Sequence, residues 1–220
     1  MRFFKHSESF NWKYILGEIV LIFIGITLAI GFDNWNSAQQ SDHNKDIAII
    51  QIKDEIQNNI QELLKARKAN TSVMNAYNKY SQLYDGNSSS VLTDQLTFHS
   101  LQESYPDFFR VTDSVRVKAN QYRYSGSTFI NIELIELTDI AWETTRSIGI
   151  ANTFDYSCLY ELSSMYKLQA RVQNELNKAA DALQNREITR LFRILGFIDQ
   201  LDKELESNYT KMLKQLDKCN

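Results

Sequence analysis

Glu18 is the residue whose position most clearly indicates a specialised role, because it is the only charged side chain in the apolar run Tyr14–Phe32. An ionisable group inside such a run is costly unless it faces a partner or a wet cavity. At helical spacing Glu18 shares one stripe with Ile22, Gly25 and Ala29, and a small-x-x-x-small pair lets two membrane helices approach closely. The stripe predicts a packing face with Glu18 hydrogen-bonding across it. The alternative is that Glu18 reaches back to the membrane interface.

A second set of residues with binding chemistry is the cationic group within Phe108–Tyr124. Arg110, Arg116, Lys118 and Arg123 stand there among phenylalanine and tyrosine residues. Cations interleaved with aromatic side chains suit an anionic ligand such as a lipid headgroup or an envelope polymer. The alternative is a solvated loop whose aromatic residues pack on the body.

Signatures of catalysis and metal binding are missing from the sequence. His6, His43 and His99 are isolated, and none stands in a spacing that suits a metal ion. There is no nucleophile elbow, phosphate-binding loop or dinucleotide fingerprint. We therefore expect no catalytic residues, no metal, no cofactor and no enzymatic activity. Cys158 and Cys219 can pair in an oxidising compartment, but two cysteines make no disulfide framework, and we expect two separate thiols.

The run Tyr14–Phe32 predicts one membrane-spanning helix. At about 1.5 Å per residue it extends roughly 28 Å, close to the hydrocarbon thickness of about 30 Å. Trp12 and Trp35 bracket the run, as interfacial anchors do at the two headgroup layers. The lipid bilayer is therefore an expected partner.

The flanking charges predict the orientation of the span. Arg2, Lys5 and Lys13 precede it, and the first positive charge after it is Lys45. The positive-inside rule then places residues 1–13 in the cytoplasm as a short tail, and the rest outside it. A cleaved signal peptide is the alternative, since a basic start followed by an apolar run suits that as well.

The composition favours a helical protein outside the span. The net charge of −3 argues against a nucleic-acid partner, because such proteins usually carry a strong basic excess. Only seven glycines and one proline occur in 220 residues, whereas a sheet needs frequent turns that draw on these residues. We therefore predict an all-α fold.

Apolar spacing divides the remainder, residues 46–220, into helices that pack as one body. The polar join 33–45 has no glycine or proline, so the span can continue into the first of them. Segment 107–129 is the least regular and fits a short strand or extended chain. Asn131 is the expected N-cap of a helix that ends at Ser147. The expected helices are 46–84, 93–103, 131–147, 153–183 and a last one with coiled-coil-like spacing from Ile188 to Leu216.

The segment Gly17–Asn36, GEIVLIFIGITLAIGFDNWN, resembles the start of a family of uncharacterised single-pass membrane proteins of Bacteroidota. The matching residues are Gly17-Glu18-Ile19, Gly25 and Asn34-Trp35-Asn36, whereas Phe32-Asp33 departs from the family's usual pattern. Segment Ala141–Gln169 is also similar to the helical body of such proteins. The resemblance implies a Gram-negative envelope, with the body in the periplasm and the anchor in the inner membrane, and it implies no activity.

These observations favour a membrane-anchored helical scaffold that assembles through its span and its helical seams, as a homo-oligomer or with another envelope membrane protein. Two alternatives remain open. Several copies can form a channel or proton path with Glu18 facing its interior, or the chain can sense a periplasmic ligand through the region Arg110–Arg123.

Overall fold

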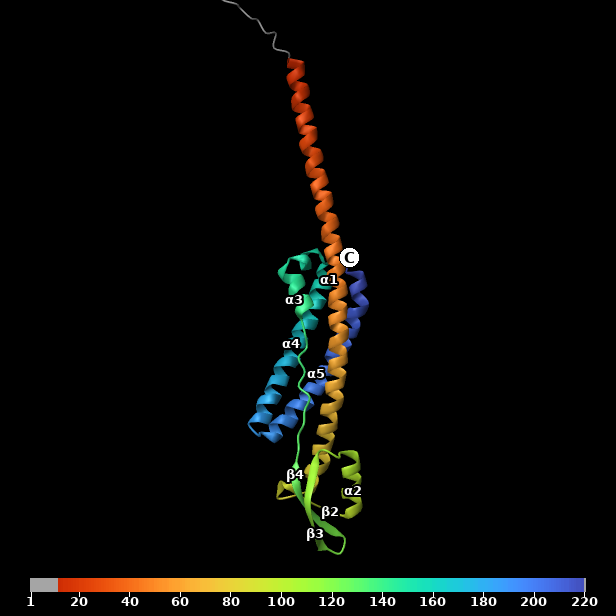
Figure 1. The fold of residues 1–220 in the computed structure, drawn as a ribbon, viewed down its shortest axis with the longest axis vertical. Helices are drawn as coiled ribbons and strands as arrows, with labels where there is room; N and C mark the ends of the chain where they lie inside the picture. The colour runs from red at the N-terminus through yellow and green to blue at the C-terminus, as the bar shows by residue number, and fades with distance from the viewer. Residues whose placement is uncertain (1–11, 220) are drawn as a thin grey trace, which may run out of the picture.

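The computed structural model describes residues 12–219, and its dominant element is one unbroken helix, α1 (Trp12–Tyr80, 69 residues). At about 1.5 Å per residue it is roughly 100 Å long. Figure 1 shows it running the length of the molecule, with the rest of the chain gathered around its C-terminal part. The polar join 33–45 is helical throughout, so the span and the first helix of the body are one element.

The N-terminal part of α1 is apolar and uncovered. Within residues 12–219, α1 is the one helix long and apolar enough to cross a membrane; its best window has a mean hydropathy of 2.0 and is 0% buried. The large apolar side chains from Leu16 to Phe32 are each half exposed or more. Leaving them in water costs on the order of 10 kcal/mol. This segment is thus compatible with a transmembrane span.

Three helices pack beside α1 to form a bundle. They are α3 (Ile140–Ser147), α4 (Tyr156–Gln184) and α5 (Ile188–Gln215), with short 3₁₀ turns at Ile150–Thr153 and Leu216–Lys218. The predicted break between the helices 153–183 and Ile188–Leu216 is confirmed, and Arg186 makes the turn with a φ of 60°. The bundle core includes Ile52, Ile56 and Leu63 of α1, packed with leucines of α4 and α5.

The far end of α1 carries a small α+β unit, here called the tip. After the 3₁₀ turn Ser81–Leu83 come β1 (Tyr84–Asp85), β2 (Asn87–Thr93), α2 (Gln95–Ser104), β3 (Phe109–Lys118) and β4 (Gln121–Thr128). The strands form one antiparallel sheet in the order β1-β2-β4-β3. Its own core holds Tyr80, Val91, Phe98, Phe109 and Tyr124, with the Phe98 and Tyr124 rings stacked 3.6 Å apart. The tip lies at the opposite end of the molecule from the span (Figure 1).

The prediction of an all-α fold is therefore wrong, and the protein is α+β. Four strands in the order β1-β2-β4-β3 need few tight turns, and Gly86, with a φ of 86°, supplies the one that needs a left-handed residue. The scarcity of glycine and proline excluded large sheets, but it did not exclude this small one. The expectation of a short strand within segment 107–129 is confirmed by β3 (Phe109–Lys118).

The predicted helix 131–147 is also wrong over most of its length. Residues 129–139, here called the strap, are extended, and α3 begins only at Ile140. Figure 1 shows the strap running from β4 along the bundle to α3. Asn131 is consequently not an N-cap. The reason is tertiary: side chains from two helices bind the backbone of the strap in place of helical hydrogen bonds.

Candidate functional site

The predicted packing face of the span lies on an uncovered side of α1. Glu18, Ile22, Gly25 and Ala29 are all exposed, and a Cβ added at Gly25 would meet no atom within 4 Å. A second helix can therefore approach the Gly25–Ala29 segment without a steric barrier.

The predicted anchors sit at the two ends of this segment. Trp12 is 63% exposed and Trp35 is 60% exposed. The Phe32 and Trp35 rings lie 5.9 Å apart, which forms an aromatic patch where the apolar run ends. This arrangement suits the headgroup level of a bilayer.

The four cations of the predicted anion site do not converge. In the β3–β4 register Arg116 lies opposite Tyr122, whereas Arg123 lies opposite Val115. Since neighbouring positions of a strand point to opposite faces, the two guanidinium groups lie on different sides of the sheet. Lys118 is exposed at the end of β3.

Three of these cations already have partners within the tip or at the start of the strap. Arg123 pairs with Asp85 at 2.6 Å, Arg116 donates to the Ala119 carbonyl at 2.6 Å, and Arg110 stacks over the Phe129 ring at 4.1 Å. These contacts hold each cation at a different place, and the four cations form no assembled anion site.

The strap is held by side-chain amides, a feature that the sequence reasoning missed. Asn70 donates to the Glu133 carbonyl at 2.9 Å and accepts from the Glu133 N–H at 2.8 Å. Asn59 makes the same pair with Thr138, at 2.7 and 3.0 Å. Gln173 accepts from the Leu137 N–H at 3.2 Å. These amides take the place of a neighbouring strand at Glu133, Leu137 and Thr138, so an extended segment can lie between helices with these backbone groups paired.

These amides are themselves tied into the bundle core. Gln169 donates to the Thr138 carbonyl at 2.9 Å and accepts from the Tyr209 hydroxyl at 2.7 Å. Burial raises the pKa of the Tyr209 hydroxyl, so it stays protonated and donates. A usable signal was present in the sequence, because Asn59 and Asn70 continue the core-facing spacing of Ile56 and Leu63.

A buried carboxylate fixes the junction of the strap and α3. Glu55 accepts from the Ala141 N–H at 2.8 Å and from the Tyr166 hydroxyl at 2.6 Å. Burial, together with the bond to Glu55, raises the pKa of the Tyr166 hydroxyl. Beside this carboxylate a groove of about 500 Å³ opens between α1 and α3. Each oxygen of Glu55 accepts one of these hydrogen bonds, so the side chain ties α1 to both α3 and α4.

A second buried charge lies in the α1–α5 seam. Asp202 is only 4% exposed, and its Oδ1 has no hydrogen-bond partner among the described residues. Arg67 binds Glu206 at 2.7 Å instead. Burial raises the pKa of Asp202 to about 7, while Arg67 opposes the rise. Ionisation of Asp202 at neutral pH and above therefore lowers the stability of the bundle.

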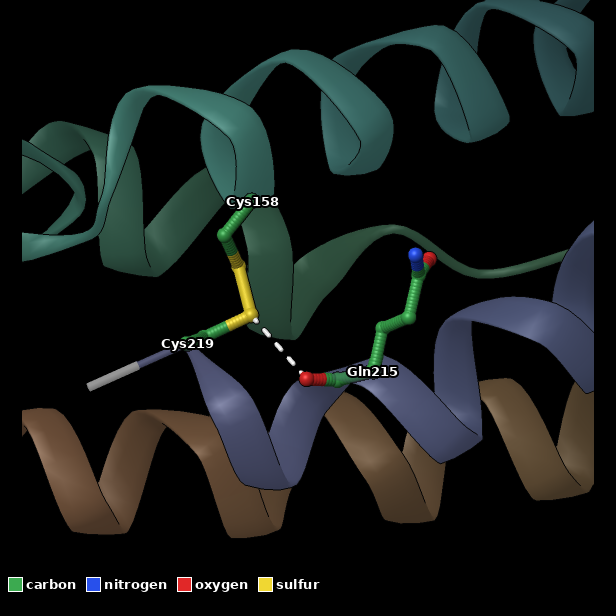
Figure 2. Close-up of a disulfide and its surroundings, with 3 residues drawn as sticks. All are labelled: Cys158, Gln215 and Cys219. Atoms are coloured by element: carbon green, nitrogen blue, oxygen red, sulfur yellow. Dashed lines mark hydrogen bonds between the residues drawn. A yellow bond between two sulfur atoms is a disulfide. The ribbon is translucent and has the colours of Figure 1, made fainter.

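Cys158 and Cys219 form a disulfide, so the expectation of two separate thiols is wrong. The pair joins the start of α4 to the end of the chain, with Cα atoms 5.5 Å apart. Figure 2 shows Cys219 one helical turn beyond Gln215, whose carbonyl oxygen lies 3.6 Å from the sulfur. Proximity in the fold, which the sequence separation of 61 hides, decides this pairing.

Among residues 12–219 no three His, Cys, Asp or Glu side chains are grouped to hold a metal ion. In the comparisons with known proteins, no family model, no curated protein and no solved structure matches the chain.

Proposed function

We propose that the protein is a single-pass inner-membrane scaffold that holds its tip at a fixed height in the periplasm as an interaction module. The continuity of α1 carries the proposal. From Phe32, where the apolar run ends, to Tyr80, beside the sheet, α1 has no break. At about 1.5 Å per residue this distance is roughly 70 Å.

The packing along α1 supports a rigid rather than a flexible connection. An isolated helix in water is marginally stable, but from Lys45 onward one side of α1 is buried against α3, α4 and α5. Outside the proposed membrane span, the part of α1 without such packing is the stalk, residues 33–44, which spans about 18 Å. The unbroken helix therefore sets the distance of the tip from the membrane and its orientation relative to the span.

Two chemical features support the periplasmic assignment. Lys and Arg are concentrated before the span, which favours a cytoplasmic N-terminus. A disulfide between Cys158 and Cys219 persists in an oxidising compartment and is rare in the cytoplasm. The resemblance to envelope proteins of Bacteroidota agrees with both.

The test combines cross-linking with a change in stalk length. A photo-reactive residue replaces Val117 of β3, which is 42% exposed, in cells that express the full chain. A matched probe at the exposed Glu204 of α5 serves as the control. Deleting seven residues, Asn36–Asp42, removes about two turns, so it lowers the tip by about 10 Å with little rotation.

We expect one adduct of defined mass at position 117, which weakens in the shortened chain. Reinsertion of seven helix-forming residues should restore it. Absence of a position-117 adduct, or an adduct that does not respond to stalk length, would contradict the proposal.

A further inference from the structure

One exposed side of α1 continues from the span into the water-facing part of the helix. At 3.6 residues per turn, the positions of the predicted packing face fall within about 40° of a single line, and the line extends through the stalk to Ile47 and Ile50. Ile47 is 45% exposed and Ile50 is 54% exposed. We call this surface the α1 face; it consists of Glu18, Ile22, Gly25, Ala29, Phe32, Asn36, Gln40, His43, Ile47 and Ile50.

The groove between α1 and α3 borders the α1 face. Ile47 belongs to both surfaces, and Ile140 and Ile148 form the opposite wall. These two isoleucines are 70% and 65% exposed. Isolated apolar residues on a surface are ordinary, but several around one groove mark an interaction site.

We propose that the α1 face and this groove bind a second copy of the chain in the same membrane, which gives a parallel two-fold dimer. The inference rests on the membrane span of the proposed function. Two copies anchored by the same helix must point the same way, so the same face can meet itself across a two-fold axis. A second α1 on that face becomes the third wall of the groove.

The symmetry determines which side chains meet. In a two-fold pair, one flank of the first helix contacts the opposite flank of the second. Ile50 lies on the flank away from the groove, and Ile47 on the flank toward it. Ile50 of each copy is therefore placed beside Ile47 and the groove of the other, which covers both exposed isoleucines.

The size of the surface is adequate for a stable contact. From Glu18 to Ile50 the face is about 50 Å long, and a strip about 10 Å wide covers roughly 500 Å² per copy. The pair then buries about 1,000 Å² before the groove walls are added, which reaches the lower bound for a biological interface. Within the bilayer, the small residues Gly25 and Ala29 allow the close approach on which helix association depends.

Lipid does not account for the groove. Its first lining residue is Asn44, about 18 Å along α1 from Phe32. The headgroup layer of one leaflet is only about 5–8 Å thick. Acyl chains therefore end well before the groove begins.

The first test is cysteine cross-linking of the full chain in liposomes. Asn36→Cys, His43→Cys and Ile47→Cys lie on the α1 face, whereas Asn34→Cys and Ala38→Cys lie on the opposite side of the helix. All five positions are exposed, and both native cysteines are already paired. We expect disulfide-linked dimers at the three face positions at least tenfold above the two controls.

The second test weakens the face outside the membrane. The double variant Ile47→Asp/Ile50→Asp is compared with Leu96→Asp, which changes an 85% exposed leucine of α2 at the tip. We expect the dimer dissociation constant to rise at least tenfold in the double variant only. A monomeric wild-type chain, equal cross-linking on both sides of α1, or face cysteines that link to a different protein in native membranes would overturn the proposal. The height of the tip can stay intact in each of these cases, so the proposed function is tested separately.

Discussion

Replacing Asp202 by Asn should remove a pH-dependent weakness from the bundle. The folded protein holds the Asp202 carboxyl at a pKa of about 7 because of its burial, with Arg67 opposing the rise, against an ordinary value of 3.8. The unfolded chain therefore releases this proton first. Stability conferred at low pH is lost as the pH rises from about 4 through about 7.

The size of the effect follows from the two pKa values. One pKa unit corresponds to about 1.36 kcal/mol. Between pH 5 and pH 8 the difference in proton binding amounts to about 2.6 kcal/mol of unfolding free energy. For a body of this size, that is a fall in melting temperature of roughly 5–10 °C. Asp202→Asn should lose none of this amount over the same interval.

The assay is urea unfolding of the full chain in nanodiscs at pH 5, 6, 7 and 8, with the disulfide intact. Fluorescence of Trp142, which is 3% exposed, reports on the bundle in a background where Trp12 and Trp35 are phenylalanine. Glu204→Gln, two residues along α5 and exposed, controls for the loss of a surface charge. Parallel pH profiles for wild type and Asp202→Asn would refute the reasoning, because they would mean that Asp202 is ionised throughout the range.

Three further changes test other parts of the structure. Asn70→Ala leaves the Glu133 N–H and carbonyl without their side-chain partner and should lower the unfolding free energy by about 1–3 kcal/mol, with faster hydrogen exchange in the strap. The exposed Asn75→Ala should not have this effect, and equal exchange in both variants would refute the role of the amide. Reducing the Cys158–Cys219 disulfide, which spans 61 residues, should lower the unfolding free energy by at most about 4 kcal/mol in the same urea assay. An unchanged unfolding free energy would contradict the pairing. Gly126→Ala places a Cβ against the Arg110 backbone carbonyl and should separate β3 from β4, seen as faster exchange in the tip with an unchanged bundle. Gly196→Ala has open space in α5 and should instead stabilise by about 1 kcal/mol, so destabilisation by both would remove the steric explanation.

Helices whose apolar residues recur at local helical spacing could be predicted from the sequence. The apolar run that ends at Phe32 and the spacing of Ile52, Ile56 and Leu63 both identify α1 correctly. Its continuity through the join 33–45 was compatible with the sequence but not required by it. Only the absence of a glycine or proline break hinted at one helix.

The strap and the sheet depended on partners that are distant in sequence. Residues such as Leu137 have helical spacing in isolation. In the fold, amides of α4 bind the backbone of Leu137 and an amide of α1 binds the backbone of Glu133, in place of helical hydrogen bonds. The cations of the predicted anion site were scattered for a related reason. Strand register decides which face of the sheet each side chain occupies. In the observed register, Arg116 and Arg123 lie on opposite faces of the sheet.

The most direct test of the central claim is the distance between two spin labels on α1. Ser37→Cys in the stalk and Lys79→Cys near the tip are both exposed, and 42 residues of helix separate them by about 63 Å. Labelled full chain, diluted with unlabelled chain in nanodiscs, should give one narrow distance distribution near that value by pulsed electron paramagnetic resonance. A broad distribution, or a main distance below about 50 Å, would mean that α1 bends or breaks, and it would contradict a tip held at fixed height above the membrane.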